Sequence, residues 1–385
     1  MNVKAIALAA AAAAAATSAN AADLPSANAV DYVKACDAYG SGFFVMPGSD
    51  TCLKVGGRVR IEARFNNFSD DGVWGDKTKN STNFYARGYA RLDARTQSEL
   101  GLIRSYASLY ITDTSDGSSS ATLESGFVQV GGFFVGRDYS QFDQFTGYVN
   151  GDAVRRGYSD QTTWSATYTA DLGQGFTAKI GTEDATDRVV GVVDASGTLT
   201  EAGTRLPTIM GGLNFNQGWG SAALYAAAQE LRSIDAGVDS TVGYGVQATV
   251  KLNLDMLTPG SQAVFQAAYA DGAMSYIGAD QKYDADGAVS GTKIEKSKGY
   301  TFGGGLNINL TDTVSARGEG TYMSVKNDVT GDYKRYATAG SLEYATSEGL
   351  RLAGVVSYAN TDFSTDSANV DTKDTRFTFR VQRDF

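Results

Sequence analysis

Arginines occupy alternate positions in three consecutive segments near the start of the chain. A guanidinium group stays protonated at every physiological pH, and its planar head can stack on rings or bind carboxylates. If the three segments are adjacent strands, these side chains share one face and form a permanently positive wall. The row consists of Arg58, Arg60, Arg64, Arg87, Arg91, Arg95 and Arg104.

The remaining composition limits which other chemistry is available. The 385 residues include no histidine, which excludes Ser-His-Asp and Cys-His catalysis and His-ligated zinc. Asp and Glu number 43 against 33 Lys and Arg, and a net charge of −10 argues against nucleic acid as the main partner. Because no Ser-centred, paired-carboxylate, metal-binding or cofactor-binding motif is evident, we expect no enzyme, no metal site and no cofactor.

Alternation of residue types predicts long β-strands throughout the chain. Between Leu53 and Phe65 one face is apolar, whereas the other carries lysine, arginines and a glutamate. Such a period of two is typical of a strand with one polar and one apolar face. The pattern predicts sixteen strands, with an ambiguous phase over 121–137: 53–65, 84–96, 100–112, 121–131, 133–137, 161–171, 176–183, 207–216, 221–231, 242–254, 261–269, 300–310, 314–325, 335–346, 350–358 and 375–385.

The connections between these segments alternate between short and long. Tight turns such as 97–99, 311–313 and 347–349 separate long polar loops such as 184–206 and 270–299. Outer-membrane β-barrels sort their connections in this way and contain an even number of strands. A soluble sandwich has no reason to do so. The sequence therefore predicts an all-β transmembrane antiparallel barrel of sixteen strands over residues 53–385.

The first residues are typical of a secretory signal peptide. Lys4 precedes an apolar run from Ala5 to Ala16, and Ala19-Asn20-Ala21 gives an A-x-A cleavage site. We therefore expect a signal peptide over 1–21 and a mature chain that begins at Ala22. No later window approaches the roughly 18 to 20 apolar residues that a membrane helix needs.

The segment 22–52 is too short to form a domain and contains both cysteines. Cys36 and Cys52 are the only cysteines of an exported chain, and oxidising compartments favour disulfides. We expect them to pair and to staple a short N-terminal extension, with a contribution of roughly 3 kcal/mol from closing so short a loop.

The last segment ends on an aromatic residue. Phe377, Phe379, Val381 and Phe385 share one face, which Arg383 interrupts near the end. This pattern resembles the signal that outer-membrane barrel-assembly machinery recognises, and it predicts an assembly role for Phe385.

Two blocks of the sequence resemble a known family. The first is VDYVKACDAYG at 30–40, followed by GFF at 42–44 and PGSDTCLKVGG at 47–57; the second is GRDYSQFD at 136–143. Together with the terminal Phe385, they are similar to the general porins of alphaproteobacteria, the family typified by Brucella and rhizobial porins. The resemblance implies a sixteen-stranded barrel, a homotrimer and a third loop that folds inward and narrows the pore.

An inward third loop would bring Asp138, Asp143 and Asp152 toward the positive wall. We therefore predict a pore constriction between these carboxylates and the seven arginines, across which a transverse field would orient small polar solutes. The alternative is that the arginines pair locally and merely keep the lumen wet.

The leading functional hypothesis is a passive diffusion channel for small hydrophilic solutes and ions in the bacterial outer membrane. Its expected partners are the lipid and lipopolysaccharide of that membrane, the barrel-assembly machinery and small solutes, with no nucleic acid. A substrate-specific channel, for sugars or other small nutrients, is the alternative, since Tyr85, Tyr89, Tyr106 and Tyr110 lie on the polar faces. An outer-membrane enzyme and a purely structural barrel are two further alternatives.

Overall fold

The computed structural model describes residues 34–68, 76–279, 284–328, 331–365, 367 and 369–385. The expected signal peptide over 1–21 and its cleavage site lie outside these ranges. Sixteen long strands form the wall, and each pairs antiparallel with its neighbours. Their bounds are β2 Cys52–Asn66, β3 Thr82–Ser98, β4 Gly101–Thr114, β5 Ser119–Val130, β6 Phe133–Tyr139, β7 Thr162–Gly173, β8 Phe176–Glu183, β11 Thr208–Gln217, β12 Gly220–Leu231, β13 Thr241–Asn253, β14 Gln262–Asp271, β17 Lys298–Asn309, β18 Val314–Lys326, β19 Tyr333–Ala345, β20 Leu350–Phe363 and β21 Thr372–Asp384.

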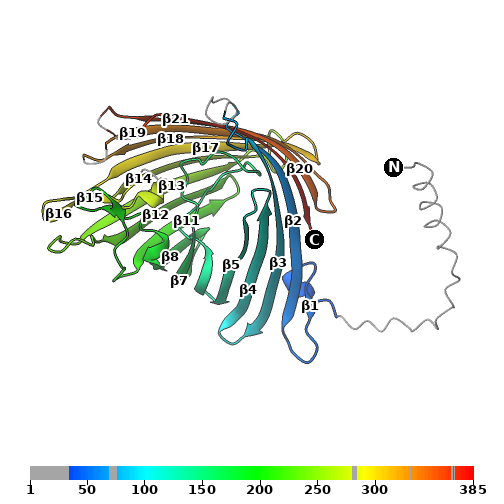
Figure 1. Cartoon of the computed structure of the whole chain (residues 1–385). Helices are drawn as coiled ribbons and strands as arrows, with labels where there is room; N and C mark the ends of the chain where they lie inside the picture. The colour runs from blue at the N-terminus through cyan, green and yellow to red at the C-terminus, as the bar shows by residue number, and fades with distance from the viewer. Residues whose placement is uncertain (1–33, 69–75, 280–283, 329–330, 366, 368) are drawn as a thin grey trace, which may run out of the picture.

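The wall closes on itself, because the last strand pairs with the first. β2 and β21 are in antiparallel register from Arg58 opposite Asp384 to Asn66 opposite Arg376. The terminal residue completes this seam: Gly57 N donates to Phe385 O at 2.8 Å and Phe385 N donates to Gly57 O at 3.1 Å. Figure 1 shows the resulting ring, with β2 beside β21. The predicted sixteen-stranded antiparallel barrel is confirmed.

The two faces of the wall differ as the alternation predicts. Large apolar side chains such as Phe84 and Ile111 are 63% and 67% exposed on the outside, whereas Glu62 and Arg380 lie on the inside. In water such a continuous apolar surface would be costly, but in a bilayer it is the required exterior. No helix among the described residues is long and apolar enough to cross a membrane.

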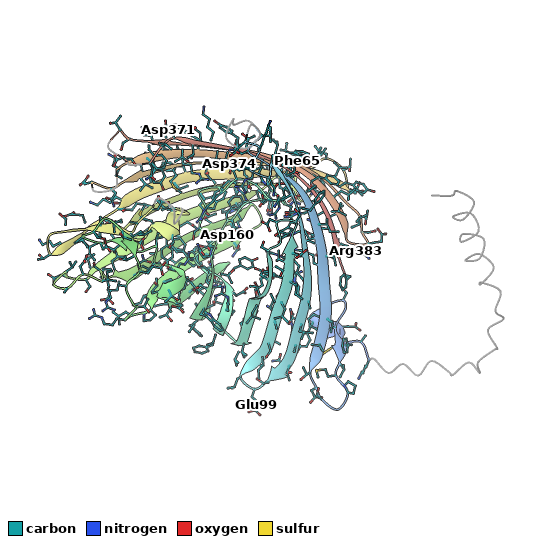
Figure 2. All side chains as sticks on the ribbon, in the orientation of Figure 1. Phe65, Glu99, Asp160, Asp371, Asp374 and Arg383 are labelled. Atoms are coloured by element: carbon teal, nitrogen blue, oxygen red, sulfur yellow. A yellow bond between two sulfur atoms is a disulfide. The ribbon has the colours of Figure 1, made fainter. Side chains whose placement is uncertain are left out.

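The connections follow the predicted alternation. The short ones include 99–100, 131–132, 174–175 and 218–219, and all lie at one end, which we call the short-turn end. Figure 2 labels Glu99 at this end. The long ones lie at the opposite end, except for the third, residues 140–161, which we call the inner loop.

Four short strands in the long loops and one in the N-terminal extension were not predicted. They are β1 Phe44–Val45, β9 Val192–Val193, β10 Leu199–Thr200, β15 Gly287–Ser290 and β16 Lys293–Lys296. Four of them form a small sheet of their own, in which β15 pairs in parallel with β9, Gly287 with Val192 and Ala288 with Val193. Segments of two to four residues carry too few positions for a period to be read from the sequence.

The ambiguous phase over 121–137 has a structural cause. Opposite β4, Ser108 pairs with Ser125 but Leu109 pairs with Leu123, so Glu124 is an extra residue in β5. Such a β-bulge shifts the alternation by one position. The exposed side chains accordingly stand at odd-numbered positions before the bulge, Ala121 and Leu123, and at an even-numbered position after it, Val128.

The N-terminal extension folds back onto the short-turn end of β2 (Figure 1). The predicted disulfide is present, with a Cα–Cα distance of 6.0 Å between Cys36 and Cys52. β1 pairs with the start of β2, and Cys36 N donates to Phe43 O at 2.9 Å. The extension is thereby fixed against the inner side of the barrel mouth.

Removing this disulfide should loosen the extension and leave the barrel intact. Without the cross-link, the segment loses roughly 3 kcal/mol of loop-closure stabilisation. In a Cys36→Ser, Cys52→Ser variant we therefore expect protease cleavage within residues 34–51 to accelerate while the thermal midpoint of the barrel is unchanged. Wild-type protein treated with reductant should give the same cleavage pattern, and equal protection of the variant and the oxidised wild type would contradict the expectation.

Candidate functional site

The seven predicted arginines line one continuous sector of the lumen, which we call the basic wall. Arg58, Arg60 and Arg64 lie on β2, and the β2–β3 register puts Arg60 opposite Arg87. Arg91 and Arg95 continue the row along β3, and Arg95 lies opposite Arg104 of β4. The alternation therefore predicted both the strands and the face of all seven side chains correctly.

Five members of the basic wall are paired with carboxylates. Arg60 and Arg64 bind Glu62, at 3.8 and 2.5 Å. Arg95 and Arg104 both bind Asp93, with N–O distances of 2.8 and 2.9 Å, and Arg58 binds Asp384 at 2.6 Å. These pairs are part of the local pairing that the alternative hypothesis anticipates.

Arg60 and Arg87 also stack on tyrosine rings. The Arg87 guanidinium lies 3.8 Å from the Tyr110 ring centroid, and that of Arg60 lies 5.1 Å from the ring of Tyr85. Arg60 also donates to the Tyr85 hydroxyl at 2.7 Å. Ring stacking leaves a guanidinium charged and fixes its position. Arg87 forms no ion pair among the described residues, whereas Arg60 also lies 3.8 Å from Glu62.

Two further arginines, which were not predicted as site residues, extend the wall across the seam. Arg376 and Arg380 lie on the inner face of β21, and Arg380 binds the buried carboxylate of Glu62 at 2.5 Å. Glu62 also accepts a hydrogen bond from Arg64 at 2.8 Å. The signal was present in the polar face of the last strand, but only closure of the barrel makes that strand a neighbour of β2.

The inner loop crosses the lumen and attaches to the far wall. The buried carboxylate of Glu319 on β18 accepts hydrogen bonds from the backbone N–H groups of Tyr148 and Val149, and it pairs with Arg156 at 2.7 Å. Val154 N donates to Ser357 Oγ of β20 at 3.0 Å. These contacts, together with Asp160 inside the ring of strands in Figure 2, place the loop within the barrel.

Glycines on β17 provide the seat for the aromatic residues of this loop. A Cβ at Gly303 would lie 2.5 Å from the Tyr158 ring, and one at Gly305 would lie 3.0 Å from Tyr148. The Tyr158 hydroxyl donates to Gly304 O at 3.1 Å. Burial raises the pKa of Tyr158, so this donor stays protonated. The glycine run 303–305 therefore marks in the sequence the place where the aromatic residues of the inner loop pack, although it was not used for a prediction.

Asp152 is the one predicted loop carboxylate that meets the basic wall. Its Oδ1 lies 3.9 Å from Arg64 and its Oδ2 lies 3.3 Å from Arg376. Thr378 of β21 donates to the backbone oxygen of the same residue at 2.8 Å, which fixes the loop there. A cavity of about 830 Å³ opens beside these groups on the long-loop side.

The other two predicted carboxylates lie elsewhere. Asp138, at the end of β6, accepts a hydrogen bond from Ser125 Oγ at 2.8 Å. Asp143 is buried at the base of the inner loop, 3.3 Å from Arg188 of the next long loop. Arg188 also pairs with Glu183 at 2.9 Å and donates to Ser159 at 2.8 Å. Asp143 thus ties the two ends of the inner loop together and does not contact the basic wall.

A family model described as a porin subfamily matches residues 23–383, which is nearly the whole chain. The chain belongs to this porin family. Among curated relatives, porin Omp2b of Brucella suis biovar 1 (strain 1330) is 35% identical over 242 residues, covering 58% of this chain and 65% of the relative. Porin Omp2b of Brucella neotomae is 36% identical over the same shares. The porin therefore matches less than two thirds of the length of these relatives.

Solved structures share the fold of this porin at low sequence identity. The outer membrane channel DcaP of Acinetobacter baumannii has a TM-score of 0.72 at 16% identity, over 89% of this chain and 99% of that one. The anion-selective porin from Comamonas acidovorans has a TM-score of 0.54 at 12% identity, over 87% and 100%. The family and the closed barrel together identify an integral protein of the bacterial outer membrane.

A buried carboxylate joins two long loops of the porin outside the membrane-spanning strands. Asp286 accepts hydrogen bonds from the backbone N–H groups of Val190 and Met274, both at 2.7 Å. Burial raises the pKa of Asp286 to about 7. The folded loops therefore bind a proton more tightly than an unfolded chain does, and their stability falls as the pH rises from about 4 through about 7.

We expect the amides of Val190 and Met274 to be less protected at pH 8 than at pH 5. Hydrogen exchange, corrected for intrinsic rates, measures this protection. An Asp286→Asn variant has no ionisable group at this position and should show little difference between the two pH values. Wild-type protection that is equal or greater at pH 8 would contradict the expected sign.

Proposed function

We propose that this porin is a water-filled channel for the passive diffusion of small hydrophilic solutes and ions. The observation that carries the proposal is a closed barrel of sixteen strands with charged side chains inside and an inner loop bound across its lumen. A barrel of this size is too wide for its own side chains to fill, so it encloses water. The family supports this function over an enzymatic or purely structural one.

The narrowest passage lies between the inner loop and the basic wall. Asp152 supplies the negative side and Arg64 with Arg376 the adjoining positive side, while Arg60 and Arg87 face the passage with stacked guanidinium groups. Opposed charges in a confined space produce a transverse field, which favours small polar solutes over apolar ones. The excess of cations on this wall should favour anions.

In this proposal the chain works as a homotrimer. A signal peptide over 1–21 directs its export, and barrel-assembly machinery that recognises Phe385 inserts it into the outer membrane. OmpT of Vibrio cholerae, a structure with a TM-score of 0.52 and 12% identity over 88% of this chain and 100% of that one, is described in a trimer form. The exposed ring of Phe385 beside the seam is accessible to an assembly partner.

Single-channel recording of the purified protein in a planar bilayer tests the proposal. We expect stepwise conductance that rises linearly with salt concentration, together with solute flux that does not saturate. Saturable flux of one solute class would instead favour a substrate-specific channel. Absence of current from correctly folded protein would refute the proposed function.

A further inference from the structure

The N-terminal extension and the basic wall enclose a second cavity, at the short-turn end of the lumen. Its volume is about 420 Å³, within the range of small-molecule sites. Four aromatic residues and three cations line it: Tyr39, Phe43, Tyr106, Phe385, Lys54, Arg91 and Arg95. It is separate from the passage beside Asp152, whose cavity shares none of these residues.

The carboxylates that border this cavity are already neutralised. Asp93 is bound by Arg95 and Arg104, at 2.8 and 2.9 Å. Asp384 is bound by Arg58 at 2.6 Å. Because both side-chain carboxylates already have an arginine partner, Arg91 and Lys54 add positive charge to the cavity.

Two cations remain without a carboxylate partner among the described residues. Arg91 makes no ion pair there, and its buried Nε has no hydrogen-bond acceptor. Its partner on β2 is Gly56, which has no side chain, and the Tyr89 ring lies 5.0 Å from its guanidinium. Lys54 donates to the backbone oxygen of Ser41 at 3.1 Å, which occupies one of its three N–H groups. A buried donor without an acceptor is costly and indicates a missing partner.

The extension supplies the apolar side of the cavity. Phe43 is only 6% exposed, and its ring lies 4.8 Å from the Arg95 guanidinium and 5.8 Å from Lys54 Nζ. The Tyr39 ring packs against Phe43 with centroids 6.0 Å apart. The disulfide between Cys36 and Cys52 fixes both rings in place. The site thus combines fixed aromatic rings with unpaired cations.

We propose that this cavity binds small aromatic carboxylates, with the carboxylate on Arg91 and Lys54 and the ring against Phe43 and Tyr39. A carboxylate satisfies the N–H groups of a guanidinium and an ammonium, and an aromatic ring matches the apolar side. The site lies at the end where outer-membrane barrels face the periplasm, so it meets solutes as they leave or enter that compartment.

Titration calorimetry of the detergent-solubilised porin with benzoate tests the proposal without requiring a current. We expect saturable benzoate binding, with acetate and benzyl alcohol each at least tenfold weaker because one lacks the ring and the other the charge. Arg91→Gln and Lys54→Gln should each weaken benzoate binding about tenfold, and Phe43→Ala should weaken it as well. Lys251→Gln, which removes a cation from the opposite side of the barrel on β13, is the matched control and should bind like wild type.

Benzoate binding that is unchanged in both Arg91→Gln and Lys54→Gln, or equal affinity for benzoate and acetate, would overturn the site. If Arg91→Gln fails to fold, reductant-treated wild type replaces it, since a released extension should lose the preference for benzoate over acetate. A conducting porin without saturable benzoate binding refutes this site alone, whereas benzoate binding by a porin that carries no current refutes only the proposed channel.

Discussion

Replacing Arg60 and Arg87 together by glutamine should reduce the preference of this porin for anions over cations by roughly tenfold. The two side chains lie opposite each other on β2 and β3 and stack on tyrosine rings, and the one carboxylate paired with either of them among the described residues is Glu62, 3.8 Å from Arg60. Each unit charge about 6 Å from a passing ion contributes about 0.7 kcal/mol in water, and two such charges, about 1.4 kcal/mol together, correspond to about a tenfold change in selectivity. Reversal potentials in a salt gradient measure the ratio.

A control for this double variant removes two cations from the long-loop end. Arg205 pairs with Glu230 outside the barrel, and Lys293 is exposed at the start of β16. Arg205→Gln combined with Lys293→Gln changes the net charge of the chain by the same amount. We expect its reversal potential to stay near the wild-type value, because salt screens charges far from the narrow passage. An equal shift in both variants would show that net charge, rather than the basic wall, sets selectivity.

Replacing Glu319 by glutamine should release the inner loop from the far wall. The carboxylate accepts hydrogen bonds from Tyr148 and Val149 and pairs with Arg156, and it is almost fully buried. Breaking one side of a buried ion pair costs about 3 kcal/mol or more, which lowers the ratio of attached to detached loop by about a hundredfold. We expect larger and noisier single-channel currents, together with faster protease cleavage in residues 140–161.

Glu230→Gln is the matched control, since it breaks the ion pair between the end of β12 and Arg205 of a long loop. Its currents should resemble those of wild type. If a correctly folded Glu319→Gln variant gives the same currents as wild type, the packing of the inner loop on the β17 glycines and the contacts of Asp152 hold the loop without Glu319.

Strand number and facing were predictable because alternation is a local property. The segment 53–65 could present Arg58, Arg60 and Arg64 to water and Val59 and Ile61 to lipid in only one way, and the same logic applied to every long strand. The only ambiguous region contains the bulge at Glu124, where an extra residue shifts the period. A local pattern cannot reveal such an insertion without knowledge of the partner strand.

The candidate site was predictable only in part. The sequence indicated which arginines face inward, but it treated Asp138, Asp143 and Asp152 alike. The structure separates them: Asp152 meets Arg64 and Arg376, Asp138 binds Ser125 and Asp143 is buried against Arg188. These partners come from residues up to 224 positions apart, and their choice depends on the path of the inner loop across the lumen.

By itself, then, the sequence determined the closed barrel, its two faces and its disulfide, because each depends on residue types at fixed short spacings. Only the tertiary structure decided which charges meet. Closure places Arg376 and Arg380 beside β2, and the inner loop takes Asp152 to that seam. The extension brings the rings of Tyr39 and Phe43 to Arg95. Contacts between distant segments depend on where loops pack, and no period along the chain encodes that packing.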